Sequence, residues 1–167
     1  MHIAITGANS SVGKVLLRHV AGQNDLLARA GVRTSQAVAT LPRFSAVTPC
    51  VIRYDDRDSL TALLTGVRCL VHLAGILIES KHSTYQTANV DATRAVVDAC
   101  RDANVEHIVF ISVLGADINS GNRYYHSKGV AEQIVAQSGI SATTIRTPIL
   151  LGPDTAGARA LVGMASR

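Results

Sequence analysis

The sequence predicts an α/β fold, a doubly wound parallel sheet in one domain spanning residues 1–167. Short apolar runs alternate with amphipathic helical patterns, an order that favours right-handed crossovers and a parallel sheet. The chain is 47% hydrophobic but only 4% aromatic, so its core would consist of Val, Ile, Leu and Ala, as in strands covered on both faces. A glycine-containing turn separates the first apolar run from the first helical pattern.

Six apolar runs rich in β-branched residues or leucine predict the strands, at Ile3–Thr6, Leu26–Val32, Cys50–Tyr54, Cys69–Leu73, His107–Ser112 and Thr143–Leu150. Helical periodicity predicts four connecting helices, at Val12–Ala21, near Ser59–Thr65, from about Tyr85 to Ala103, and at Tyr124–Ser138. The stretch between the second and third strands is expected to be a short helix and a loop, because Pro42 and Pro49 punctuate it.

The net charge of +4 is spread along the chain. Arginines are scattered from Arg18 to Arg167 without a basic block interleaved with aromatics, which argues against nucleic-acid binding. A mild positive field also suits an anionic cofactor with several phosphates. The longest apolar run, Cys69–Ile78, is too short to span a membrane, and no signal peptide fits the first residues. We therefore expect a cytoplasmic protein.

Cysteine and histidine patterns argue against disulfides and metal sites. Three widely spaced cysteines, an odd number, are interpreted as buried thiols in a reducing compartment: Cys50, Cys69 and Cys100. The six histidines show no i,i+4 pair and no partner at ligand spacing, so no metal site is expected. His72 lies in a buried strand and is interpreted as a core histidine, and His126 is assigned no role.

The turn after the first strand predicts a nucleotide site. It reads Thr6-Gly7-Ala8-Asn9-Ser10-Ser11-Val12-Gly13 and leads into a helix. Unpaired N–H groups and the positive dipole end at that helix N-terminus suit a dinucleotide pyrophosphate. A turn that merely caps the helix remains an alternative. The residues expected to contact the cofactor here are Gly7, Asn9, Ser10, Ser11, Val12 and Gly13.

Further motifs follow in order, namely Leu73-Ala74-Gly75, Ala88-Asn89-Val90-Asp91-Ala92-Thr93, Ser112 at a strand end, and Tyr124-x-x-x-Lys128. With the glycine turn they cover nearly the whole chain, and together they resemble the short-chain dehydrogenase/reductase superfamily. The segments 110–117, 127–132 and 146–153 are most similar to its atypical or extended branches, with complex I accessory-subunit-like and NmrA-like proteins as the nearest relatives. The resemblance implies a Rossmann-type fold and a dinucleotide bound near Leu73, Ala74, Gly75, Tyr124, Lys128 and Pro148.

Four residues are the candidate catalytic set. Tyr124 and Lys128 share one helix face, where a protonated lysine favours the phenolate and makes the tyrosine a usable acid–base group. The resemblance implies that Ser112 holds the substrate oxygen and that Asn89 provides a water or backbone link to Lys128. Packing, capping and solvated roles for all four remain the alternative.

The choice of nucleotide depends on the end of the second strand. Arg33 stands there, with no acid before Asp55, and a basic residue favours the 2′-phosphate of NADP over the free hydroxyl of NAD. NADP is therefore the expected cofactor, with NAD as the second option. Asp55 resembles the family's adenine-contacting aspartate. A surface arginine and a turn aspartate are the alternatives for these two residues.

Two departures from the family pattern bear on function. Ser10 replaces the middle glycine, so its hydroxyl is expected near the phosphates and can bond one of them. The C-terminal substrate part of extended members is largely absent before Arg167. The predicted function is an NAD(P)-dependent oxidoreductase or epimerase/dehydratase-like protein that uses Tyr/Lys acid–base catalysis with hydride transfer on an unidentified small molecule. The alternative is a non-catalytic NADP(H)-binding sensor or assembly subunit. Two further questions stay open: whether the chain is a fragment of a longer enzyme, and whether it forms a homo-oligomer.

Overall fold

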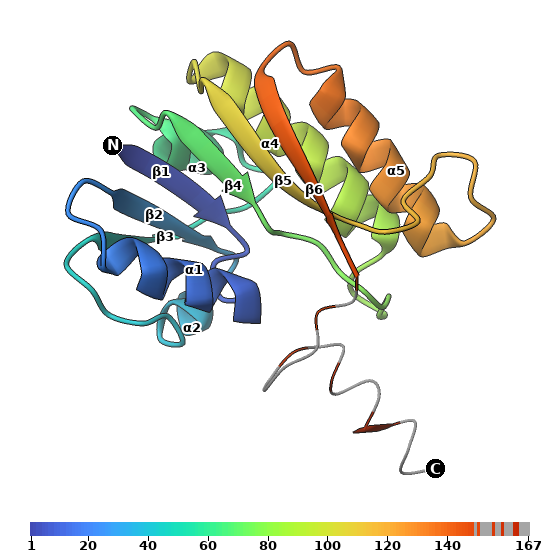
Figure 1. Ribbon diagram of the computed structural model, residues 1–167, viewed down its shortest axis with the longest axis horizontal. Coiled ribbons are helices and arrows are strands. Elements are labelled where there is room, and N and C mark those ends of the chain that lie inside the picture. Colours follow the sequence, from blue (N-terminus) through green and yellow to red (C-terminus); the bar gives the residue numbers. More distant parts are fainter. Residues whose placement is uncertain (149, 151–154, 156–157, 159–161, 164–167) are drawn as a thin grey trace.

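Six parallel strands form one sheet in the order β3-β2-β1-β4-β5-β6 (Figure 1). The computed structural model describes residues 1–148, 150, 155, 158, 162 and 163. The strands are β1 His2–Thr6, β2 Leu27–Val32, β3 Val47–Val51, β4 Cys69–His72, β5 His107–Val113 and β6 Ser141–Thr147. The helices are α1 Ser11–Ala21, α2 Ser35–Val38, α3 Arg57–Leu64, the π-helix η1 Gln86–Asp91, α4 Ala92–Asp102 and α5 Arg123–Ala136. This confirms the predicted Rossmann-type sheet.

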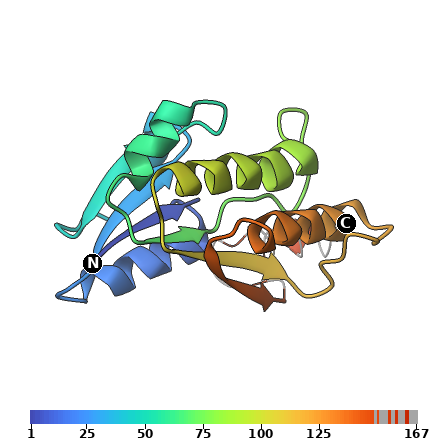
Figure 2. The same cartoon turned by 90° about the horizontal axis from the view of Figure 1, so that it is seen from above.

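Helices cover the two faces of the sheet in separate groups. Helix α1 lies on one face, and α3, α4 and α5 lie on the other (Figures 1 and 2). Alternation along β1 divides the core accordingly: Ala4 packs with the α3–α5 side, whereas Ile3 and Ile5 pack with Leu17 of α1. Because all neighbouring strands are parallel, their carboxyl ends lie along a single edge of the sheet.

The third strand begins earlier than the sequence pattern predicts. The predicted range was Cys50–Tyr54, but β3 occupies Val47–Val51 and contains Pro49, paired with Ala30 of β2. The interpretation of Pro49 as loop punctuation was wrong because β3 is an edge strand. A proline without an N–H is tolerated where one side of the strand needs no partner.

Two other differences concern the bounds of the last strand and the type of the long helix. The last strand, predicted at Thr143–Leu150, spans Ser141–Thr147. The single helix predicted from about Tyr85 begins as the π-helix η1 and continues as α4. Side-chain periodicity barely distinguishes these helix types, whereas π-turns occur often at functional sites.

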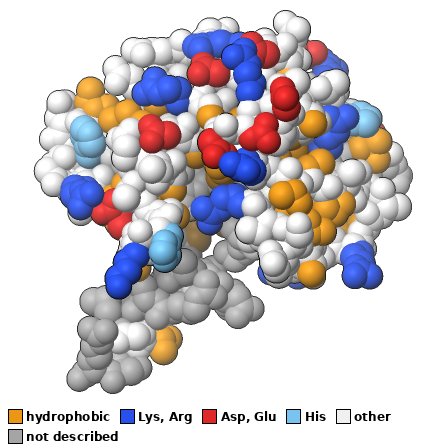
Figure 3. Space-filling view, turned by 180° about the vertical axis from the view of Figure 1, so that it is seen from behind, with side chains coloured by type: hydrophobic (Ala, Val, Ile, Leu, Met, Phe, Trp, Pro, Cys, Tyr) orange, Lys and Arg blue, Asp and Glu red, His pale blue; other side chains and the backbone are white. Residues whose placement is uncertain are grey.

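Charged side chains of both signs are mixed on the face formed by α3, α4 and α5 (Figure 3). Arg57 of α3 pairs with Asp102 of α4, and Arg101 pairs with Asp98 within α4. Such exposed pairs typically contribute little stability, so packing must hold these helices on the sheet.

Helix α5 packs directly on the loop that follows β5. A Cβ at Gly129 would lie 2.4 Å from the carbonyl carbon of Asp117 and 2.5 Å from the nitrogen of Ile118. We expect Gly129→Ala to lower the free energy of unfolding by about 1–3 kcal/mol, because backbone must move to admit the methyl group. Urea denaturation provides the measurement. Gly121→Ala is the matched control, since nothing lies within 4 Å of the added Cβ, and an equal loss in both variants would contradict the close packing.

Candidate functional site

Two adjoining pockets lie at the carboxyl ends of the strands. The first, of about 790 Å³, is lined by the turn after β1, the ends of β2, β3 and β4, and residues of η1. The second, of about 230 Å³, is lined by the ends of β5 and β6 and the start of α5. The pockets share the segment 73–76, which follows β4. Ligands of doubly wound sheets bind at this edge, where the strand order reverses between β1 and β4.

The turn after β1 has a geometry that requires glycine. Gly7 has a φ of +68°, and a Cβ there would lie 2.9 Å from the backbone nitrogen of Ala74. A Cβ at Gly13 would lie 2.5 Å from the carbonyl oxygen of Ala8, so this glycine lets α1 pack on the turn. The absence of a side chain at Gly7 lets the turn pack against the backbone that follows β4, and Gly7 lines the first pocket.

Ser10 caps helix α1. Its Oγ accepts a hydrogen bond from the backbone nitrogen of Gly13 at 3.0 Å, and its side chain lines the first pocket. The hydroxyl proton remains available to donate, so capping and phosphate binding are compatible roles. The predicted contacts at Val12 and Gly13 are not placed at either pocket, because both residues already belong to α1, beyond the turn.

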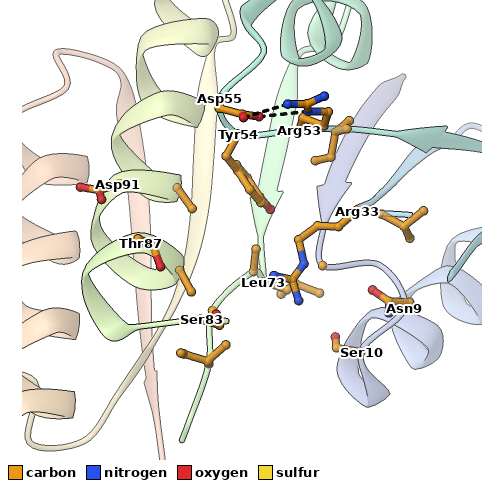
Figure 4. A pocket seen from close by; sticks show the side chains of 18 of the residues that line it. Asn9, Ser10, Arg33, Arg53, Tyr54, Asp55, Leu73, Ser83, Thr87 and Asp91 are labelled. Atoms are coloured by element: carbon orange, nitrogen blue, oxygen red, sulfur yellow. Dashed lines mark hydrogen bonds and ion pairs between the residues drawn. The ribbon is translucent and has the colours of Figure 1, made fainter. Parts of the chain in front are cut away.

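Arg33 projects into the first pocket from the end of β2, toward Leu73 and Ser10 (Figure 4). No described residue forms a hydrogen bond or an ion pair with its guanidinium. An unpaired cation beside the helix N-terminus favours an anionic ligand, and a phosphate group is the natural partner.

Arg53 and Asp55 form an ion pair at the rim of the same pocket (Figure 4). Arg53 donates to both carboxylate oxygens, at 3.1 and 2.9 Å, and these hydrogen bonds lower the pKa of Asp55. Tyr54 lies between them in sequence, and burial raises its pKa to about 12 against the opposing effects of Thr6 and Arg33. Arg53 and Tyr54 are pocket residues that were not predicted, because the expected third strand, Cys50–Tyr54, covered them.

The second pocket brings together all four candidate catalytic residues: Asn89, Ser112, Tyr124 and Lys128. Ser11 and Pro148 line it as well. Ser112 Oγ is buried, and no hydrogen bond of ordinary geometry reaches it from the described residues. A buried hydroxyl without a partner costs free energy unless a ligand or water satisfies it. Ser112 is therefore poised to bind a polar atom in this pocket.

Lys128 bonds a strand carbonyl and lies over an aromatic ring. Its Nζ donates to the carbonyl oxygen of Ile111 at 2.8 Å and lies 4.3 Å from the centroid of the Phe110 ring. Burial lowers the pKa of Lys128 to about 8, and the charge of Glu132 opposes that shift. The ammonium group is thus fixed by one carbonyl and one aromatic face.

Tyr124 lies beside two other tyrosine rings. The phenol is half-buried, and burial together with the neighbouring Tyr85 and Tyr125 raises its pKa. Its ring lies 5.6 Å from that of Tyr85 and 5.7 Å from that of Tyr125. The raised pKa keeps the phenol protonated at neutral pH, and the effect of Lys128 on the phenolate stays a prediction.

Asn89 connects the pocket wall to α5. Its Oδ1 accepts from the backbone nitrogen of Ile76 at 2.8 Å, and its Nδ2 donates to Ser127 Oγ at 3.0 Å. The same Nδ2 donates to the carbonyl oxygen of Ile76 at 3.3 Å, and the expected link to Lys128 through a water or the backbone stays a prediction. Asn89 thus fixes the segment after β4 relative to the helix that bears Tyr124 and Lys128.

Glu132 is a charged neighbour of the site that the sequence analysis left without a role. It receives two hydrogen bonds from Arg146, at 2.9 and 2.5 Å. Burial acts to raise the pKa of Glu132, but Arg146, the Ser112 hydroxyl and the charge of Lys128 hold it below its ordinary value. Glu132 follows Lys128 by one helical turn, a spacing that could have indicated the proximity of the two charges.

The fold and the two pockets at the carboxyl ends of its strands define a Rossmann-type domain. The chain belongs to the family described as NAD(P)H-binding, whose pattern matches residues 7–165. Among curated proteins, it is 29% identical over 165 residues to the ceramide reductase of Caulobacter vibrioides, covering 99% of this chain and 51% of the reductase. It is 23% identical over 154 residues to the mitochondrial NADH dehydrogenase 1 alpha subcomplex subunit 9 of Arabidopsis thaliana, covering 90% and 38%.

Solved structures share the fold. The UDP-glucuronic acid 4-epimerase of Bacillus cereus, in complex with NAD, superimposes with a TM-score of 0.80 at 18% identity, covering 99% of this chain and 64% of the epimerase. The oxidoreductase ylbE of Lactococcus lactis superimposes with a TM-score of 0.72 at 20% identity, covering 87% and 68%. The chain spans about half the length of the Caulobacter reductase, and less of the Arabidopsis subunit.

Three further features bear on the sequence predictions. Among the described residues, no helix has the length and apolarity required to cross a membrane. In the same part of the chain, no three His, Cys, Asp or Glu side chains gather in a way that could hold a metal ion. The three cysteines are free; Cys100 is buried, whereas Cys50 and Cys69 are only half-buried, so the expectation of buried thiols holds fully for one of them.

Proposed function

We propose that this domain binds NADP(H), with the adenosine half in the first pocket and the nicotinamide in the second. The observation that carries the proposal is the continuity of the two pockets along the segment 73–76, with the Arg33 cation in one and the buried Ser112 hydroxyl in the other. The turn at Gly7 lines the first pocket, leads into the N-terminus of α1 and suits the pyrophosphate. The residues present therefore fit a dinucleotide.

The chemistry that these residues support is carbonyl–alcohol interconversion. Bound nicotinamide would supply or accept the hydride. Ser112 Oγ donates a hydrogen bond to the substrate oxygen, and Tyr124 transfers its phenolic proton to that oxygen during reduction or takes it back during oxidation. The charge of Lys128 limits the cost of the phenolate left behind. Oxidoreductase and epimerase-like reactions both require these steps, and the substrate is an unidentified small molecule.

Arg33 provides the test of cofactor choice. NADPH should bind more tightly than NADH, and Arg33→Ala should weaken NADPH binding by about tenfold or more because a charge-assisted contact with the 2′-phosphate is lost. Titration of nicotinamide fluorescence measures both affinities. Arg43→Ala is the matched control, since Arg43 is exposed and lines neither pocket. Equal affinities for the two nucleotides in the unmodified protein would refute the NADP preference.

A non-catalytic nucleotide-binding role is the second candidate. It is favoured by the similarity to NADH dehydrogenase subunit 9 and to the photosystem II assembly factor Ycf39 of Cyanophora paradoxa. This role predicts NADP(H) binding without turnover of any carbonyl compound. The cytoplasmic location, the single domain and homo-oligomerisation remain predictions.

A further inference from the structure

His72 is a buried histidine that lines neither pocket. His72 ends β4, is 1% exposed, and pairs in register with Thr6 at the end of β1. Its Nδ1 lies 2.6 Å from Thr6 Oγ1, and its Nε2 lies 3.1 Å from Thr93 Oγ1 in the first turn of α4. Thr93 Oγ1 in turn donates to the backbone carbonyl oxygen of Asn89 at 2.6 Å.

The directions of these hydrogen bonds follow from elementary donor and acceptor counts. A carbonyl oxygen can only accept, so the single hydroxyl proton of Thr93 points at Asn89. Thr93 Oγ1 must then accept from His72, which places a proton on Nε2. A neutral imidazole carries only one N–H, so Nδ1 accepts from the Thr6 hydroxyl. Every polar atom of the ring is satisfied in this one arrangement.

The imidazole is held in its neutral form. Burial, together with the nearby positive charge of Lys128, lowers the pKa of His72 to about 3. The ring stacks on Phe110 at a centroid distance of 5.7 Å, and the ammonium of Lys128 lies over the same Phe110 ring. No acidic group is recorded against the imidazole in the described part of the chain, so nothing there stabilises a second ring proton.

The ends of this chain of hydrogen bonds belong to the two halves of the candidate site. Thr6 directly precedes Gly7, whose turn opens on the first pocket. Asn89 lines the second pocket and, through its amide, fixes Ile76 and Ser127. Thr6, Thr93 and Asn89 are all at most 1% exposed, so water cannot readily replace the ring.

We propose that His72 is a positioning residue whose neutral imidazole, protonated on Nε2, fixes the turn at Gly7 and the π-helix at Asn89 in one relative register. A dinucleotide must contact the turn at Gly7 and the second pocket at Asn89 at the same time, so its affinity depends on the spacing of the two. The affinity of a ligand that fills only the adenosine half does not depend on that spacing. The inference rests on the proposed function for the identity of that dinucleotide. The tautomer of His72 and its hydrogen bonds do not depend on the proposed function.

Removing one hydroxyl tests the role with little change of shape. In Thr93→Val we expect the Kd for NADPH to rise by about tenfold, as one buried hydrogen-bond link is lost. The Kd for adenosine 2′,5′-bisphosphate should change less than about twofold. Thr93→Ser keeps the hydroxyl and should restore NADPH binding. Calorimetric titration of the full chain measures all these affinities, and circular dichroism confirms that each variant is folded.

Nitrogen-15 NMR of the histidine rings tests the tautomer separately. We expect one imidazole to be protonated on Nε2 and to keep its shifts from pH 5 to pH 8. A titrating ring or an Nδ1–H tautomer at His72 would overturn the inference, as would equal weakening of both ligands in Thr93→Val or no weakening at all. An unmodified chain that binds neither ligand would refute the proposed function, and with it the positioning role, whereas the spectrum alone decides the tautomer.

Discussion

Tyr124→Phe should lower the turnover of a carbonyl substrate by about 10²–10⁴-fold while leaving NADPH affinity nearly unchanged. The phenol lines the second pocket with Ser112, and burial raises its pKa, so it is protonated and ready to donate at neutral pH. Phenylalanine keeps the ring contacts with Tyr85 and Tyr125 but removes the proton. Steady-state kinetics with an identified substrate, together with nucleotide titration, measure the two effects.

Tyr125→Phe is the matched control for that prediction. Tyr125 is the next residue on α5, about 100° around the helix, and does not line the second pocket. It should change neither turnover nor NADPH affinity appreciably. Full activity in Tyr124→Phe, or loss of activity only in Tyr125→Phe, would contradict the assignment of the acid and favour the non-catalytic role.

The sheet could be predicted from the sequence because its interior strands are short, apolar and punctuated by turns. Burial on both faces leaves runs such as Ile3–Thr6 and His107–Ser112 almost free of charge. The edge strand β3 could not be placed correctly, since Val47–Val51 is half-exposed and contains Pro49. The pairing of β3 with β2 depends on tertiary structure, so the local sequence pattern does not predict it.

The candidate site was predictable as a set of residues but not as a set of contacts. The family-like order placed Asn89, Ser112, Tyr124 and Lys128 together, and the structure gathers them at one pocket. Their functional roles remain predictions. Helical spacing suggested that Lys128 faces Tyr124, but the ammonium bonds the Ile111 carbonyl, a partner from a strand 17 positions away. Hydrogen bonds between elements depend on packing that spacing does not encode.

The burial of His72 could be predicted from the sequence, but its hydrogen-bond partners could not. A histidine within an apolar strand run predicts a satisfied core side chain, and the structure confirms this interpretation with bonds to both ring nitrogens. The two partners, Thr6 and Thr93, are 66 and 21 residues away, so neither could be named from the sequence pattern. The consequence of such a buried, neutral base is a stability that depends on pH.

Acidification should destabilise the fold through His72. The pKa of this imidazole is about 3 in the folded chain, below its ordinary value of 6.5. Below pH 6.5 the unfolded chain therefore binds a proton that the folded chain refuses, and the free energy of unfolding falls as the pH falls toward 3. One such proton corresponds to a loss of about 2 kcal/mol between pH 7 and pH 5.

The matched variant for this effect is His72→Phe, which keeps an aromatic ring beside Phe110 but cannot titrate. It should be less stable than the unmodified protein at pH 7, since the Thr6 and Thr93 hydroxyls lose their partner. Its free energy of unfolding should nevertheless fall less between pH 7 and pH 5, because contributions from all other groups are common to both proteins. Urea denaturation at several pH values gives both curves. Parallel curves would show that His72 accepts a proton in the folded chain as readily as in the unfolded one, contrary to its burial beside the Lys128 charge.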